Sequence, residues 1–179
     1  MISLQMAGLV AGTLLTAVGG GGVFRPAPVR RLLDTFPRHR PSAVVLLLVN
    51  VIWVTLMVYH APLGRFEWVK PFLFILAPVT FFAVLYYMEE LLAPRMLGGL
   101  LLLAANPALN AARWHESAWR LVLTTFVYFV IVWAMILVLS PYRFRYTVEW
   151  CYRGARRVVA FGSLLVLGVV LLALSVAVY

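Results

Sequence analysis

Three polar residues, Asn106, Asn110 and Arg113, recur at helical spacing inside an otherwise apolar stretch of the chain. Intervals of four and three residues place their side chains on one face of a helix. Within a membrane, such a face can line a path for a small solute or bond to a neighbouring helix. Pro107 adds a bend, because it lacks an N–H and frees a carbonyl of the preceding turn. We expect the stripe to face another helix, with a pore as the alternative.

Two further polar side chains, Asn50 and Thr80, fall near the middle of apolar segments. Side-chain hydrogen bonds between membrane helices contribute roughly 0.6–2 kcal/mol, so we expect both residues to join helices. In a channel or facilitator for a small solute, Asn50, Thr80, Asn106 and Asn110 would instead line one water-accessible path. No ionisable residue falls at mid-membrane in a predicted span, which argues against a proton-coupled transporter.

The tripeptide Asn106-Pro107-Ala108 is similar to the motif with which water channels line their pores. That resemblance implies two half-helices that meet at the bilayer centre, each with one copy of the motif. This chain contains a single copy and is shorter than members of that family. The tripeptide therefore favours a bent helix over a water channel.

The composition predicts an all-α polytopic membrane protein, with a single transmembrane domain over residues 1–179 and no soluble domain. Hydrophobic residues make up 64% of the chain and charged residues 12%, against roughly a quarter in soluble proteins. The basic residues that give the chain its net charge of +9 lie between the apolar segments. They therefore indicate membrane topology and not nucleic-acid binding. The first apolar stretch has no basic region before it and no clear cleavage motif, so we expect it to be retained as an anchor.

Six segments are long enough to span a membrane, which takes roughly 17–25 residues. They cover residues 2–24, 41–60, 71–88, 95–112, 121–139 and 158–179. The fourth has only a short uninterrupted apolar run, so five spans plus a re-entrant segment are the alternative. Lys and Arg accumulate in cytoplasmic loops. The two Arg-rich loops, residues 25–40 and 140–157, lie on the same side of the membrane only if the fourth segment crosses it. We expect six spans in a bacterial inner membrane, with both termini on the outer side.

Catalytic and cofactor sites have few candidates in the sequence. Glu89 and Glu90 with Arg95 resemble the Glu-Glu-x-x-x-Arg motif of CAAX-type membrane proteases, but the spacing is one residue longer and later spans hold no histidine. His60 and His115 would both lie at the outer face of the membrane. Two opposed histidines there could bind a haem, or a single histidine could bind a pigment. We expect no catalytic residue, no metal and no cofactor; a membrane-embedded hydrolase and a haem- or pigment-binding protein are the alternatives. The single cysteine excludes an internal disulfide.

Glycines in the first and fourth spans predict close helix contacts. Gly8 and Gly12 form a Gly-x-x-x-Gly pair, and Gly98 and Gly99 are adjacent. Glycine lets helix backbones approach closely, and lipid-buried helices associate largely through such contacts.

Residues 140–157 form the most organised loop of the sequence. If helical, they carry an aromatic stripe beside arginines in an i, i+4 ladder with Glu149, so rings would lie among lipid headgroups and guanidinium groups on lipid phosphates. The pattern FR-x-x-x-EW-x-x-R also resembles one near the C-terminus of YeiB-like membrane proteins. We expect contact with anionic lipids at the cytoplasmic face through Tyr142, Arg145, Tyr146, Trp150, Arg153, Arg156 and Arg157.

These features together predict a non-enzymatic integral subunit, or a self-associating scaffold, of a larger membrane assembly. The expected partners are other membrane subunits or further copies of the chain, because the predicted helices leave no soluble domain to carry an activity.

Overall fold

The computed structural model describes residues 4–88, 91–113 and 119–177, which contain helices and short turns but no strand. The predicted all-α membrane bundle is confirmed: the chain is 92% helical, and six helices are long and apolar enough to span a membrane. The long helices are α1 (Leu4–Phe24), α3 (Arg40–His60), α4 (Lys70–Tyr87), α5 (Leu92–Arg113), α6 (Arg120–Leu139) and α8 (Arg156–Ala177). The shorter elements are α2 (Pro26–Thr35), η1 (Phe36–Arg38), η2 (Gly64–Val69) and α7 (Tyr142–Cys151).

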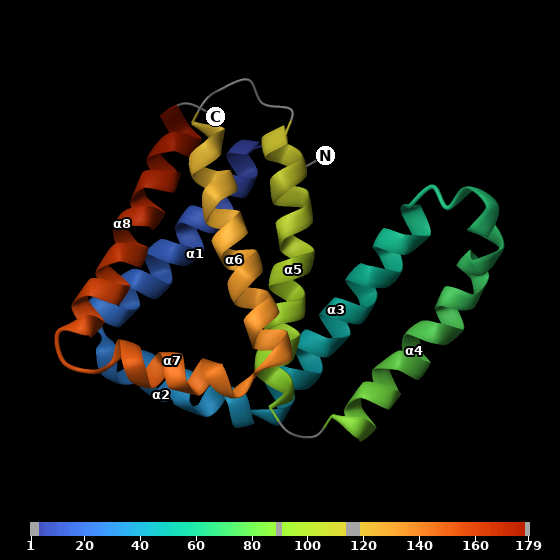
Figure 1. The fold of residues 1–179 in the computed structure, drawn as a ribbon, viewed down its shortest axis with the longest axis horizontal. Coiled ribbons are helices and arrows are strands. Elements are labelled where there is room, and N and C mark those ends of the chain that lie inside the picture. Colours follow the sequence, from blue (N-terminus) through green and yellow to red (C-terminus); the bar gives the residue numbers. More distant parts are fainter. Residues whose placement is uncertain (1–3, 89–90, 114–118, 178–179) are drawn as a thin grey trace.

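Four long helices, α1, α5, α6 and α8, form the main body of the protein (Figure 1). They share an apolar core in which Leu123 of α6 and Leu171 of α8 are completely buried. Small residues such as Ala105 and Ala112 of α5 complete this core. Many outward-facing side chains of the same helices, such as Leu14 of α1 and Phe129 of α6, are apolar as well, as expected where lipid replaces water.

The fourth predicted span is one continuous helix. α5 covers 22 residues and contains Pro107 without interruption. At about 1.5 Å per residue it is about 33 Å long, which is enough to cross the hydrocarbon layer. The expectation of six spans therefore holds for this segment, and the re-entrant alternative does not fit its shape.

Helices α3 and α4 form an arm that stands away from the main body (Figure 1). Ala43, near the start of α3, packs with Leu92 and Ala93 at the start of α5. From this base the arm diverges from α5, and none of the residues of α4 is buried. The arm is consequently held to the rest of the chain at one end.

The short helices α2 and α7 lie across the same end of the molecule as the base of the arm (Figure 1). The start of α1 and the end of α8 lie at the opposite end. This arrangement puts the two Arg-rich segments, residues 25–40 and 140–157, together and away from the start of α1 and the end of α8.

Candidate functional site

Asn50 is the polar link between the arm and the main body. Its side chain is buried, and Nδ2 donates hydrogen bonds to the carbonyl oxygens of Leu46 (2.7 Å) and Met96 (2.9 Å). Met96 belongs to α5, so one of these bonds joins two spans. The contact needs a glycine opposite, because a Cβ on Gly99 would lie 3.1 Å from Asn50 Oδ1.

Thr80 and the stripe on α5 do not pack between helices of this chain. Thr80 is exposed on α4, and Asn106 and Asn110 are exposed on α5. Asn110 Nδ2 donates a hydrogen bond to Asn106 Oδ1 over 3.0 Å, so the two amides satisfy each other in part. Arg113 is also exposed, and its carbonyl accepts a bond from Arg120. The expectation that this stripe faces another helix is therefore wrong within the chain.

The exposure of the stripe follows from the divergence of the arm. Asn106 comes seven residues, or about two helical turns, after Gly99, so both residues lie on the same face of α5. At Gly99 this face is covered by Asn50 of α3. Toward the C-terminal end of α5, α3 diverges from α5 (Figure 1), and Asn106 and Asn110 on this face are exposed.

The four polar residues required for a channel lie in different surroundings. Asn50 is bonded between α3 and α5, whereas Thr80 is exposed on α4. Neither of the two cavities described below includes any of the four among its lining residues. The placement of these side chains does not support a continuous polar path.

The glycines pack helices of the same chain against each other. A Cβ on Gly12 of α1 would lie 3.0 Å from the carbonyl oxygen of Gly168 in α8, and one on Gly98 of α5 would lie 2.8 Å from that of Ala134 in α6. Gly8 of α1 is buried as well. The close contacts that the sequence predicts thus form within the chain, at the interface of α1 with α8 and at the interface of α5 with α6.

Helices α2 and α7 form a basic layer, here named the platform, at one end of the spans. The rings of Phe36 and Phe144 pack with centroids 5.6 Å apart, and Tyr152 Oη donates to the carbonyl of Pro26 over 3.4 Å. Arg30 lies over the Tyr152 ring at 5.5 Å. These contacts tie the segment after α1 to the segment after α6.

The outer surface of the platform carries the aromatic and basic residues that the sequence assigns to a lipid interface. Tyr142, Tyr146 and Trp150 are exposed on α7, and the Arg156 guanidinium lies 5.3 Å from the centre of the Trp150 ring. Arg145, Arg153 and Arg156 are exposed as well, and Arg157 is partly buried. The predicted ladder does not form, because α7 ends before Arg153 and no ion pair links Glu149 to an arginine in the described part of the chain.

The surroundings of two groups at the end of α7 favour their neutral forms. Burial raises the pKa of the Cys151 thiol. Burial also raises the pKa of the Tyr152 hydroxyl, although Arg157 and Arg30 oppose this change. Both groups therefore stay protonated near neutral pH, so Tyr152 keeps the proton that it donates to Pro26 and Cys151 is a poor nucleophile.

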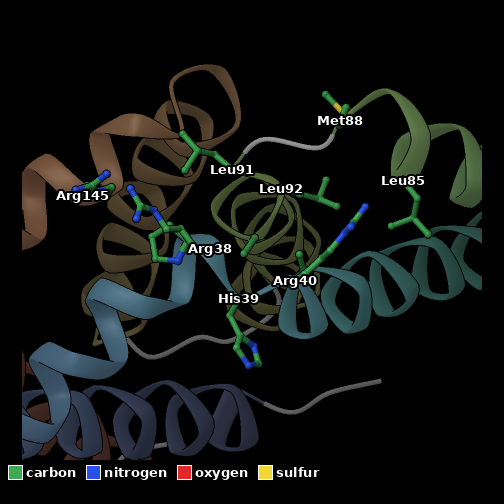
Figure 2. Close-up of a pocket in the computed structure, with 11 residues that line it drawn as sticks. Arg38, His39, Arg40, Leu85, Met88, Leu91, Leu92 and Arg145 are labelled. Carbon is green, nitrogen blue, oxygen red and sulfur yellow. The ribbon is translucent and has the colours of Figure 1, made fainter.

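A cavity of about 550 Å³ opens at the base of the arm, where η1, α3, α4, α5 and α7 meet. Figure 2 shows its basic side chains, Arg38, Arg40 and Arg145, together with apolar residues of α4 and α5. His39 is turned away, and its Nδ1 accepts a hydrogen bond from the N–H of Ser42 at the start of α3. This cavity therefore brings three basic side chains to one hollow at the platform end.

The second cavity lies along α3 and is almost entirely apolar. Its lining includes Trp53 and ends at His60, whose Nδ1 lies 2.8 Å from the carbonyl oxygen of Leu56. His115, the predicted companion of His60, falls outside the described residues, as do Glu89 and Glu90. Among the residues that are described, no group of three metal-ligating side chains comes together.

Sequence reasoning missed the residues of the first Arg-rich segment. The sequence predicts a loop over residues 25–40, but most of this segment folds into α2 and η1, and it brings Arg38 to the cavity. The helix signal was present, because Pro26 occupies the first turn, where its fixed φ and missing N–H are tolerated. The meeting of Arg38 with Arg145, more than a hundred residues later, has no such local signal.

Comparison with known proteins adds no relative: no protein-family model, no curated protein and no solved structure matches this chain.

Proposed function

We propose that the protein is a non-enzymatic integral subunit of a membrane assembly, and that a membrane helix of another polypeptide packs between its arm and α5. The partner is a second copy of the chain or a different subunit. The observation that carries the proposal is the exposed amide pair of Asn106 and Asn110, on a face of α5 that the diverging arm leaves uncovered.

Polar side chains exposed to lipid favour association with another helix. The two asparagines satisfy only part of each other's hydrogen-bonding capacity, because each amide has two donors and a carbonyl acceptor. Completing these bonds with a partner helix would contribute roughly 0.6–2 kcal/mol per bond. On the arm, Val54 and Met57 of α3 are exposed and would supply the apolar side of the same contact.

A photo-crosslinking amino acid at Met57 should capture the partner. We expect irradiation of native membranes to give a covalent product heavier than the monomer. Met57 is exposed, and it lies near the side of α3 that faces α5. The product mass, read by immunoblot and mass spectrometry, distinguishes a dimer of this chain from a complex with another subunit.

Phe129 provides the matched control, because it is an equally apolar and well exposed residue on α6 of the main body. A crosslinker there should give little product. Replacing Asn106 and Asn110 together by leucine should weaken capture at Met57 without unfolding the chain, since both side chains are exposed. Equal capture at Met57 and Phe129, or no capture at either, would contradict the proposal.

We further propose that the platform faces the cytoplasm and contacts anionic lipids there, with both termini on the outer side. Its arginines support this orientation through the positive-inside rule, and its exposed rings suit the headgroup layer. In a Cys151→Ser background, a membrane-impermeant maleimide should label Glu67→Cys in intact cells and Thr35→Cys only after permeabilisation. Both positions are exposed and lie outside the long apolar cores of the spans. The reverse pattern would invert the topology.

A further inference from the structure

The cavity at the base of the arm concentrates positive charge. Arg38 and Arg145 both line it, and in Figure 2 their guanidinium ends point toward each other. Like charges directed into one hollow repel, unless an anion lies between them. Neither arginine has a hydrogen-bond or ion-pair partner for its side chain within the described ranges. Arg40 also lines the cavity but already has an interaction, so the argument rests on the other two.

The fold holds these two arginines in place through their neighbours. Phe36 precedes Arg38 by two residues and Phe144 precedes Arg145 by one, and the two rings pack against each other. Phe144 is also buried with Leu137, at the end of α6. The arginines are therefore brought to one cavity by an apolar contact that is independent of their charge.

The backbone of the cavity also suits an anion. Leu92 and Ala93, in the first turn of α5, line it, and no acceptor for their N–H groups occurs among the residues that the structure describes. The start of a helix carries partial positive charge, which favours a negative group. Leu91, just before this turn, has a φ of 53°, a conformation that leucine rarely adopts, and such strain concentrates at functional sites.

The opposite wall of the cavity is apolar. Leu85 lies in the last turn of α4 and Met88 follows directly after its end, and the remaining surface of α4 is exposed and mostly apolar along the arm. A ligand that fits both walls has a negatively charged head for the arginines and hydrocarbon chains for α3 and α4. We propose that this cavity binds the phosphate group of an anionic phospholipid, clamped between Arg38 and Arg145. Guanidinium groups bind phosphate through strong, charge-assisted hydrogen bonds.

The test compares lipid retention by matched double variants. Native mass spectrometry of the purified protein would count bound phosphatidylglycerol and phosphatidylcholine, each added in excess. Arg38→Gln with Arg145→Gln should lower phosphatidylglycerol binding by about tenfold or more, because two charge-assisted contacts are lost. Arg31→Gln with Arg143→Gln removes the same charge from exposed positions of α2 and α7 outside the cavity, and should change binding by no more than about twofold. All four side chains are exposed, so the variants should fold.

Several results would overturn the assignment. Equal losses in the two double variants would indicate general attraction to the basic platform, and equal binding of both lipids would remove the role of negative charge. Complete displacement of phosphatidylglycerol by millimolar inorganic phosphate would assign the clamp to free phosphate instead of lipid.

Discussion

Replacing Gly19 by alanine should force α1 away from α8 and destabilise the main body by about 3 kcal/mol, at the upper end of the usual cost of overpacking. A Cβ at this position would lie 2.5 Å from the backbone nitrogen of Leu165 and 2.8 Å from the carbonyl oxygen of Phe161. Backbone atoms cannot turn aside as a flexible side chain can, so the helices themselves must separate. The midpoint of thermal unfolding in detergent would measure the loss.

The adjacent Gly20 is the control for this substitution. A Cβ there would meet its nearest neighbour, Leu165 Cδ1, at 3.5 Å, which is an ordinary contact. Gly20→Ala should leave stability unchanged or raise it slightly, because alanine is the better helix former by up to about 1 kcal/mol. If both alanines behaved alike, the α1–α8 seam would not depend on close approach of the two backbones.

Replacing Asn50 by aspartate should release the arm from the main body, at a cost of about 3 kcal/mol. The amide Nδ2 now donates to the carbonyls of Leu46 and Met96. A carboxylate would turn an acceptor toward both carbonyls and would add a charge within the membrane, where aspartate costs about 2.5–3.5 kcal/mol on insertion scales. Spin labels at Val79→Cys on α4 and Phe129→Cys on α6, in a Cys151→Ser background, should show a broader distance distribution than the parent protein.

Asn50→Ala separates the two parts of that effect. It removes the hydrogen bonds without adding charge, so we expect a loss of roughly 1 kcal/mol and only slight broadening. A narrow, unchanged distribution in the aspartate variant would show that the arm is held by contacts other than Asn50, such as those of Ala43 with Leu92 and Ala93.

Apolar length and charge spacing were enough to predict the number and approximate ends of the membrane helices. The prediction for residues 41–60 and the observed α3, for example, differ by one residue, because Pro41 and the flanking arginines mark the start. The sequence also predicts that the fourth segment crosses the membrane, because only then do the two Arg-rich loops lie on the same side. The observed α5 is long enough to do so.

What a helix faces was harder to predict than where it runs. Asn50 and Asn106 are both asparagines within apolar segments, yet one is buried between helices and the other is exposed. In lipid the outward side of a helix is as apolar as its inward side, so hydrophobic periodicity, which indicates the buried face of a soluble helix, is lost. The angle between α3 and α5 decides which asparagine is covered, and that angle depends on contacts far apart in the sequence.

The attachment of the arm at one end makes it a lever. Asn50 is close to the point where α3 leaves α5, and His60 at the far end of α3 is ten residues, or about 15 Å, further along the helix. A rotation of only about 10° about Asn50 would move that end by about 3 Å. This is close to the distance between two non-bonded carbon atoms in contact. A displacement at the pivot too small to break its hydrogen bonds would thus be larger at the far end of α3.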